Sequence, residues 1–171
     1  MKTVLLFCLG VITLFADTIG GVDYTLPNAT QYWQLKNQTE DGNSVTFLYV
    51  PKGIINPTEF FAASSTPQIL DVSDLSSIQN SLKKLYPNIT VDVKSLESKK
   101  GDHLYEWSGK MQGAETMHGW GRAINTEDGT VLFTYQSQDV SNVNALRDKW
   151  LPVLKNAKFN RTPADNLKKA I

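Results

Sequence analysis

The sequence predicts an α+β fold, in which an antiparallel β-sheet meander carries amphipathic helices packed on it as a single layered domain. Four strand-like runs follow one another with glycine-bearing breaks between them, which is the spacing of consecutive hairpins. Two other segments repeat apolar residues at helical spacing. Each of these helices has one apolar face, whereas several strands are apolar on both faces. Helices stacked on a sheet therefore bury the most apolar surface.

The meander is expected in the second half of the chain. Its strands are predicted at 89–97, 103–111, 114–124 and 131–137. Each break between them contains a glycine, which readily adopts the positive φ that tight hairpin turns require. Short breaks of this kind join antiparallel neighbours, so the strands should lie side by side in sequence order.

A hairpin and a short helical turn are expected before the meander. The hairpin has strands at 33–35 and 45–50 around a turn at 41–43. Prolines and a glycine then interrupt strand pairing. Thr58 is expected to cap a helical turn over 59–61, because a threonine hydroxyl accepts hydrogen bonds from the N–H groups of a first turn.

Two longer amphipathic helices are predicted. The first covers 74–86, with Ser73 as its N-cap and Pro87 as its stop. The second follows Ser141, and Pro152 within it is expected to kink or restart the helix, because proline lacks the N–H that an interior turn needs. Each helix has a single apolar stripe, so each is expected to pack on the sheet.

The first residues have the layout of a secretory signal peptide. Lys2 precedes an apolar run over 4–15, and the small residue Ala16 follows. The run is shorter than the ~20 apolar residues that cross a bilayer. We therefore expect residues 1–16 to direct export and to be removed near Ala16, or a few residues later near Gly20.

Cysteine usage favours an exported bacterial protein. Cys8 is the single cysteine and lies inside the predicted signal peptide, so the exported chain is expected to be free of cysteine and to fold without disulfides. Phe7 precedes it, whereas a lipoprotein needs a small residue there, so lipidation is not expected. The predicted location is the periplasm or the extracellular space. Asn-x-Thr triplets leave a glycosylated eukaryotic protein open as the alternative; they begin at Asn28, Asn37, Asn88 and Asn160.

The rest of the chain is predicted to have three parts. A polar lead-in segment at 17–31 adds one short strand around 24–26, a single α+β domain covers 32–160, and a tail at 161–171 frays. The chain has 17 basic and 17 acidic residues and no block of one sign. Nucleic-acid-binding surfaces carry a basic stripe, so we expect no nucleic-acid partner. We also expect no transmembrane segment in the exported chain.

The hairpin between the second and third meander strands carries the candidate site. A two-residue turn at Gln112-Gly113 determines which side chains face each other. Because side chains alternate along strands, the paired residues are expected on one face. The predicted pairs are Trp107 with His118, Tyr105 with Trp120, and His103 with Arg122. The candidate residues for binding a ligand or partner form the aromatic and polar rim of this face: His103, Tyr105, His118, Trp120 and Arg122.

Packing is the alternative interpretation of the same rings. Large aromatic side chains on a half-buried sheet would lie beneath the helix that contains Trp150 and contribute roughly 2–3 kcal/mol each by burial. In the predicted register Gly119 and Gly121 fall on the opposite face. Phe133 and Tyr135 of the next strand are expected to fill the space beside these glycines.

Metal and catalytic chemistry is not expected from this hairpin. In the predicted register the two histidines stand ~13 Å apart along the strands, too far to share a zinc ion with ligand distances of about 2.1 Å. Glu106 and Glu115 have the same ~13 Å separation, beyond the usual 5–9.5 Å or so between glycosidase carboxyls. Glu115 is expected to pair with Lys110 instead. The chain has no nucleophile elbow, phosphate loop or dinucleotide fingerprint, so we expect no cofactor and no metal.

Three stretches resemble PsbP-type domains. They are Val45–Pro51, the end of the meander at 131–135, and the closing segment at 150–159. Domains of this type have an antiparallel sheet flanked by helices and occur in exported and lumenal accessory proteins. Most act without catalysis, as binding or assembly factors for other proteins. The resemblance therefore implies the fold and a binding role, and it assigns no binding residue.

These observations together predict an exported, non-catalytic binding or accessory (assembly) domain that recognises a protein or a small ligand. The alternative is a secreted hydrolase with a non-standard site around His118. A third hypothesis is a carrier of a small apolar ligand, which requires a cavity in the layered domain.

Overall fold

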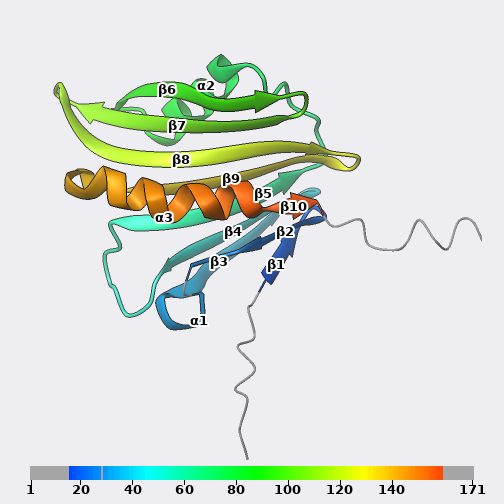
Figure 1. The fold of residues 1–171 in the computed structure, drawn as a ribbon, viewed down its shortest axis with the longest axis horizontal. Coiled ribbons are helices and arrows are strands. Elements are labelled where there is room, and N and C mark those ends of the chain that lie inside the picture. Colours follow the sequence, from blue (N-terminus) through cyan, green and yellow to red (C-terminus); the bar gives the residue numbers. More distant parts are fainter. Residues whose placement is uncertain (1–15, 28, 160–171) are drawn as a thin grey trace, which may run out of the picture.

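A seven-stranded antiparallel sheet forms the centre of the computed structural model, which describes residues 16–27 and 29–159 (Figure 1). The predicted C-terminal tail and, apart from Ala16, the predicted signal peptide lie outside these residues. The strand order is β3-β4-β5-β9-β8-β7-β6, so two meanders are joined where β5 pairs with β9. The strands are β3 (Trp33–Asp41), β4 (Ser44–Pro51), β5 (Glu59–Thr66), β6 (Thr90–Lys99), β7 (Asp102–Met111), β8 (Ala114–Thr126) and β9 (Gly129–Ser137).

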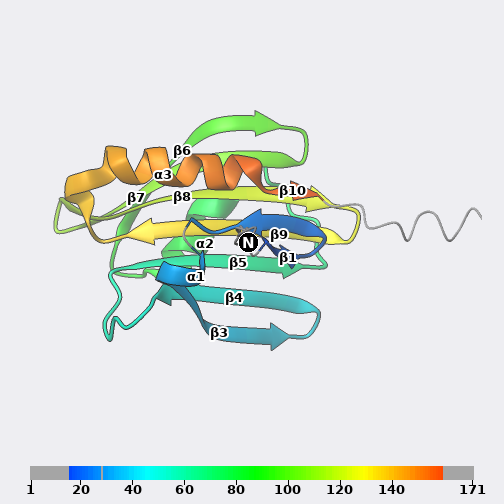
Figure 2. The same ribbon diagram turned by 60° about the horizontal axis from the view of Figure 1, so that its bottom comes forward.

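One face of this sheet is covered by a long helix and a small second sheet. The helix α3 (Val143–Asn156) lies over β8, and the second sheet has the order β1-β2-β10. Figure 2 shows α3 and the β1–β2 hairpin over the same face of the large sheet. The remaining elements on this side are β1 (Ala16–Ile19), β2 (Val22–Thr25), β10 (Lys158–Phe159), and the short helices α1 (Ala29–Tyr32) and η1 (Val140–Asn142).

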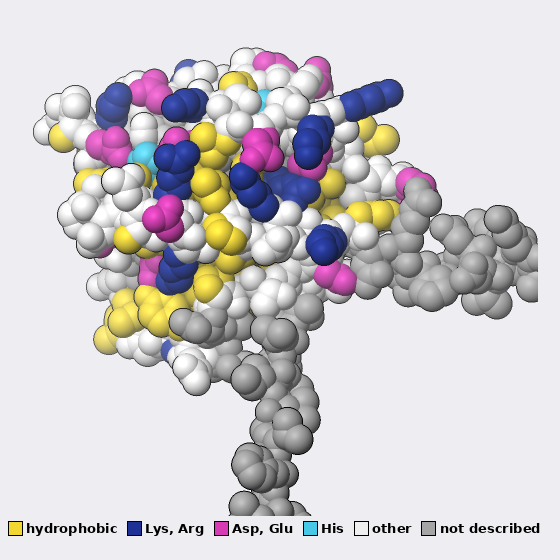
Figure 3. All heavy atoms as spheres, viewed as in Figure 1, with side chains coloured by type: hydrophobic (Ala, Val, Ile, Leu, Met, Phe, Trp, Pro, Cys, Tyr) yellow, Lys and Arg dark blue, Asp and Glu magenta, His cyan; other side chains and the backbone are white. Residues whose placement is uncertain are grey.

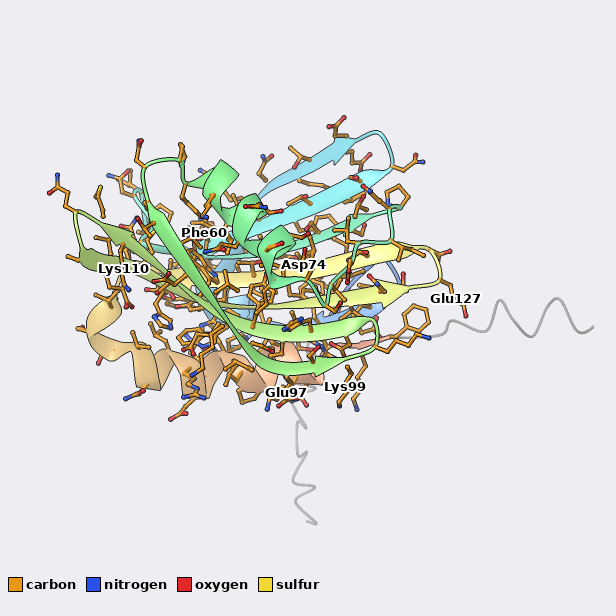
Figure 4. All side chains as sticks on the ribbon, turned by 90° about the horizontal axis from the view of Figure 1, so that it is seen from above. Phe60, Asp74, Glu97, Lys99, Lys110 and Glu127 are labelled. Carbon is orange, nitrogen blue, oxygen red and sulfur yellow. The ribbon has the colours of Figure 1, made fainter. Side chains whose placement is uncertain are left out.

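The other face carries the helix α2 (Leu75–Leu85). Asp74 is its N-cap, since the Asp74 carboxylate accepts a hydrogen bond from the backbone N–H of Ser76 at 2.9 Å; Ser73, the predicted cap, does not serve this role. Leu82 packs α2 onto a cluster that includes Trp107 of β7. The helix lies on the β6–β7 side of this face, and β4 and β5 extend beyond it (Figure 4).

The pairing of β7 with β8 contains one extra residue. Lys110 pairs with Glu115, as predicted, but Gly109 pairs with Met117, so Thr116 forms a β-bulge. A shift of one residue moves every later side chain of a strand to the opposite face. The predicted register is therefore wrong beyond the first pairs of the hairpin, although the predicted tight turn is present.

Large rings pair with glycines in the observed register. Tyr105 lies opposite Gly121, and Trp107 lies opposite Gly119. A Cβ atom on Gly121 would stand 2.3 Å from the Tyr105 ring, and one on Gly119 would stand 2.5 Å from Nε1 of Trp107. The space beside these glycines is thus filled by rings of β7, not by the rings of β9 that the predicted register assigned to it.

The main core lies between the large sheet and α3. Phe61 of β5 stacks on Trp150 of α3 with ring centroids 5.5 Å apart, and Tyr135 of β9 stacks on the same indole at 4.0 Å. Tyr24 of β2 contacts Phe61 at 5.7 Å. Aromatic side chains bury large apolar areas, so this group contributes much of the burial that stabilises a domain folding without disulfides.

The segment before the large sheet contains more structure than predicted. Residues 17–31, expected to add one short strand, contribute the β1–β2 hairpin, and Ile19 and Tyr24 are buried in the main core. Asp17 accepts a hydrogen bond from the Tyr49 hydroxyl at 2.7 Å. This contact ties β1 to β4.

The four meander strands and the two long helices confirm the predicted α+β fold. The helical turn predicted over 59–61 is wrong, because these residues begin β5, which pairs with β4 on one side and β9 on the other. Phe61 faces α3 and Phe60 faces the opposite side, so both faces of this strand are apolar. The helix α3 continues through Pro152 without a restart.

Both edge strands of the large sheet carry a β-bulge. β3 contains the extra residue Lys36, and β6 contains the extra residue Leu96. Bulges interrupt the row of unpaired N–H and C=O groups that would otherwise attract another strand. Each exposed edge is therefore protected against pairing with a neighbouring molecule.

We expect Gly119→Ala to lower the free energy of unfolding by roughly 1–3 kcal/mol, the usual cost of overpacking. The added Cβ would stand 2.4 Å from the backbone oxygen of Tyr135, which cannot move without breaking the sheet. Gly109→Ala is the matched control, because the atom nearest to its Cβ would be a side-chain methyl carbon, Cγ2 of Ile89 at 2.8 Å, and not a backbone atom. Urea unfolding of both variants measures the difference. Equal losses would contradict the observed packing of β8.

Candidate functional site

The five candidate binding residues lie on two faces of the sheet. His118, Trp120 and Arg122 face α3, whereas His103 and Tyr105 face α2, because the bulge in β8 shifts the register. These side chains therefore do not gather into the single rim that the predicted register gave. Each has its own surroundings.

Two of them are buried structural groups. Trp120 is fully buried and stacks on Tyr135 with centroids 6.2 Å apart. His103 is also buried, with Nδ1 2.7 Å from the backbone oxygen of Val72 and Nε2 2.9 Å from Oγ of Ser95. Its imidazole thus ties the segment before α2 to strands β6 and β7.

Arg122 fastens the end of α3 to the sheet. Its Nε and Nη2 atoms donate to the two carboxylate oxygens of Asp102, at 2.9 and 2.8 Å. Its Nη1 atom donates to the backbone oxygens of Leu154, Lys155 and Ala157 at the C-terminus of the helix. The last carbonyls of a helix lack partners within the helix, and the planar guanidinium is suited to reach several acceptors together.

His118 lies between two carboxylates. Its Nε2 is 2.9 Å from Oε1 of Glu106, and its Nδ1 is 2.7 Å from Oε1 of Glu115. Trp120 donates from Nε1 to the same Glu106 oxygen at 3.2 Å. A neutral imidazole has one N–H and can donate only one hydrogen bond. Both contacts are therefore hydrogen bonds only when the imidazole and the two carboxyl groups carry two protons between them. The predicted wide separation of the two glutamates is wrong, because the bulge brings both to one ring.

The contacts of His118 limit the chemistry of this cluster. Ser108 is its cross-strand neighbour, but a Ser–His pair needs an imidazole nitrogen free to accept the hydroxyl proton, and both nitrogens face carboxylates. Within residues 16–27 and 29–159, no group of three or more His, Cys, Asp or Glu side chains is arranged to hold a metal ion. The arrangement favours a role in holding the β7–β8 hairpin together.

A groove of about 570 Å³ opens on the α2 face, where the helix leaves part of the sheet uncovered (Figure 4). It exceeds three other surface hollows, of about 120, 260 and 400 Å³. Small-molecule sites usually occupy roughly 300–1,000 Å³. The larger apolar side chains in its lining are Leu48, Phe60, Leu70, Ile78, Leu82 and Leu132.

Strands β4, β5, β9 and β8 supply the floor of this groove, where large apolar side chains alternate with small ones. Along β5, Phe60, Ala62 and Ser64 all line it. A strand rises about 3.3 Å per residue, so this part of the floor is ~13 Å long. Two rows of paired residues cross the floor: Leu48, Ala62 and Thr134 in one, and Thr46, Ser64, Leu132 and Ala123 in the next.

The two ends of the groove differ. Near Phe60, the Tyr86 hydroxyl at the end of α2 donates a hydrogen bond to the side-chain oxygen of Gln136 on β9. This bond bridges the helix to the sheet at that end. The opposite end is formed by Ser64 and by the segment that leads into α2, where Asp71 is exposed.

The wall before α2 is fixed by polar contacts. The N–H of Leu70 donates to Oγ1 of Thr130 at 2.9 Å, and Nδ2 of Asn125 donates to the oxygen of Leu70 at 3.0 Å. The contact between His103 and the Val72 oxygen holds the next residues. Tyr86 is bonded to Gln136 at the other end of α2. The sheet therefore holds both the segment before the helix and the end of the helix. The concavity is therefore built into the fold.

The lining carries little charge. Asp71 is the one formally charged side chain among the described residues of the lining. Burial raises the pKa of the Tyr86 hydroxyl and of the Tyr105 hydroxyl, so both stay neutral near pH 7. Tyr105, whose hydroxyl is 3.4 Å from Oγ1 of Thr134, is the one candidate residue from the sequence that lines the groove.

Sequence reasoning missed most of the groove. The helical turn predicted over 59–61 is inconsistent with side chains that alternate between the two faces of the sheet, as those of β5 do. The predicted register also placed Tyr105 beside Trp120. A usable signal was present between Phe60 and Ser64, where apolar and small residues occur at both odd and even positions. Such a run indicates a strand with two contact faces.

The surface of the α3 side shows no dominant charge. Basic and acidic side chains are interspersed over this face (Figure 3). Among the helices within 16–27 and 29–159, none is both long and apolar enough to cross a membrane.

The architecture is that of a PsbP-like domain, with helices on both faces of an antiparallel sheet. The solution structure of cyanobacterial PsbP (CyanoP) from Synechocystis sp. PCC 6803 is similar over 91% of this chain and 98% of that chain, with a TM-score of 0.56 and 14% sequence identity. LpqN, described as involved in cell envelope biogenesis of Mycobacterium tuberculosis, has a TM-score of 0.38 and 10% identity, over 80% of this chain and 82% of that one. No protein-family model and no curated protein matches the sequence. The similarity to CyanoP confirms the PsbP-like fold.

We expect Arg122→Lys to lower the free energy of unfolding by about 2–3 kcal/mol, because lysine keeps the charge but cannot reach Asp102 and the helix carbonyls together. Lys110→Ala, which breaks an exposed ion pair with Asp92, should have little effect. Urea denaturation compares the two variants. If Arg122→Lys is as harmless as the control, the guanidinium does not secure α3.

Proposed function

We propose that this chain is an exported, non-catalytic binding domain with an accessory role, and that the groove on the α2 face is its ligand site. The observation that carries this proposal is the uncovered part of the sheet, which forms an apolar groove of about 570 Å³ beside a helix fastened at both ends. Small-molecule sites are typically concave, mostly apolar and largely preformed. The PsbP-like fold supports the same role, since the resemblance implies binding without catalysis.

A small apolar molecule fits this groove better than a folded protein partner. Protein interfaces usually bury roughly 800 Å² on each side across a broad surface, whereas this site is a concavity of about 570 Å³ between α2 and the strands. The groove also supplies what the apolar-carrier hypothesis requires, a cavity in the layered domain. The contacts of His118 with Glu106 and Glu115 count against the hydrolase alternative.

The proposal includes export of the protein. The β1–β2 hairpin favours one of the two predicted sites for removal of the signal peptide. A cut after Ala16 would keep the contact between Asp17 and Tyr49 and the buried side chain of Ile19. A cut near Gly20 would remove β1 and both contacts. The exported chain should therefore be found in the periplasm or the medium with Asp17 as its first residue.

N-terminal sequencing and intact mass of the exported protein check this expectation. A first residue at Gly21 or beyond would show that β1 is not part of the exported domain. Retention of Met1 on the exported protein would contradict the signal peptide itself.

The ligand site is tested with Ala62→Phe, which places a ring on the groove floor. Ala145→Phe is the matched control, because Ala145 is exposed on α3 on the opposite face. We expect native mass spectrometry of protein purified from its own cells to show the same bound molecule on the wild type and on Ala145→Phe, and none on Ala62→Phe. Equal melting temperatures would show that all three are folded. The same cargo on Ala62→Phe, or none on the folded wild type, would count against the groove.

A further inference from the structure

We propose that the loop between β4 and β5 docks on a phospholipid bilayer and inserts its two isoleucines into the bilayer surface. The loop covers residues 52–58, between the end of β4 at Pro51 and the start of β5 at Glu59. This inference goes beyond the ligand site and does not depend on the groove. The exposed apolar side chains of the loop, its fixed shape and its neighbouring groups support it.

Two consecutive isoleucines are exposed in this loop. Ile55 is 94% exposed, the highest fraction among the large hydrophobic side chains of the described residues, and Ile54 is 52% exposed. Figure 3 shows hydrophobic side chains gathered at the corner where Figure 1 places α1 and this loop. Tyr32 of α1 is also exposed. Exposed apolar residues that occur singly are normal, whereas neighbouring ones that form a patch indicate an interaction site.

Hydrogen bonds hold the loop in one shape. At its start, the N–H of Lys52 donates to the backbone oxygen of Tyr32 at 2.8 Å. At its end, the N–H of Gln138 donates to the backbone oxygen of Thr58 at 2.8 Å. Gly53, with a φ of +73°, turns the chain just before the isoleucines in a conformation that glycine adopts readily. A loop that is already ordered loses little conformational entropy when it binds.

The small size of the apolar patch favours a lipid surface over a protein partner. A specific protein interface usually buries roughly 800 Å² on each side and is enriched in aromatic side chains and arginine. Two aliphatic side chains on a loop cannot supply such an area. A bilayer needs no matching surface, and apolar side chains of peripheral proteins enter it to a depth of about 5–10 Å. A loop that extends past the ends of its strands, as this one does, is suited to that depth (Figure 1).

The polar groups near the isoleucines suit the headgroup layer of a bilayer. Lys52 is the one charged residue of the loop, and Nζ of Lys149 lies 5.1 Å from the centre of the Tyr32 ring. Lysine ammonium groups bind phosphate oxygens, and tyrosine is enriched at membrane–water interfaces. The carboxylate that follows the loop, Glu59, accepts hydrogen bonds from the hydroxyls of Tyr32 and Tyr135. These bonds partly offset its charge at the base of the loop.

Sedimentation with vesicles of phosphatidylethanolamine and phosphatidylglycerol tests the proposal on the intact exported protein. We expect the wild type to bind reversibly, and the double variant Ile54→Ser/Ile55→Ser to have a partition coefficient lower by about tenfold, because the inserted apolar area is lost. Ile69→Ser is the matched control, since Ile69 is 64% exposed but follows the other end of β5. It should bind as the wild type does. Binding should persist at about 0.5 M NaCl, because salt screens charges but not apolar insertion.

A fluorescent label locates the contact without removing the apolar surface of both isoleucines. Ile55→Cys and Ile69→Cys are each labelled with the NBD fluorophore, since the exported chain is expected to have no other cysteine. On addition of vesicles, NBD emission from position 55 should increase and shift to the blue. Emission from position 69 should stay unchanged.

Three results would overturn the inference. The first is no vesicle binding by the folded wild type, or equal binding by the double variant with an unchanged melting temperature. The second is loss of binding at high salt, which would indicate electrostatic adsorption instead of insertion. The third is a dimer in analytical ultracentrifugation that dissociates in the double variant, which would assign the isoleucines to a contact between two copies of the chain. None of these results affects the ligand site, which Ala62→Phe tests separately.

Discussion

The single extra residue in β8 is the constraint on which the rest of the structure depends. Thr116 shifts the pairing with β7 by one position, and β8 also pairs with β9 on its other side. The shift sends Trp120 and Arg122 toward α3, where one completes the aromatic core and the other holds the helix end. It also turns the glycines of β8 toward α2, which gives the rings of β7 the room they occupy. Without the bulge, each of these side chains would face the wrong layer.

The two faces of the large sheet are covered to different extents. On one face, α3 and the β1–β2 hairpin close a dense aromatic core around Trp150. On the other, α2 covers the β6–β7 side and leaves β4, β5, β9 and part of β8 as the floor of a groove. The second face still has fixed walls, because polar contacts hold the segment before α2 and the end of the helix. A rigid framework with one incomplete face is a common basis for ligand binding, since little ordering is needed when the ligand enters.

Periodicity predicts the strands and helices of this chain well, because alternation and turn glycines are local properties of the sequence. The meander, the tight turn at Gln112-Gly113 and the two amphipathic helices follow from such patterns. The bulge at Thr116 does not, since an extra residue leaves the length and composition of a strand unchanged. A cross-strand criterion would have detected it: the observed register sets each large ring of β7 against a glycine, whereas the predicted one set rings against rings. The groove exists because α2 covers only part of the sheet. The extent of that covering depends on tertiary packing and cannot be predicted from the pattern of one segment.

The join between the two meanders has a kinetic consequence. Every other ladder of the large sheet connects strands that are adjacent in the sequence, but β5 and β9 pair residues more than sixty positions apart. Closing so long a loop is entropically unfavourable and slows folding, so the two halves should form separately and dock late. The groove floor takes β4 and β5 from one half and β8 and β9 from the other. An occupant would therefore bridge this seam and, by mass action, hold the docked state against local opening.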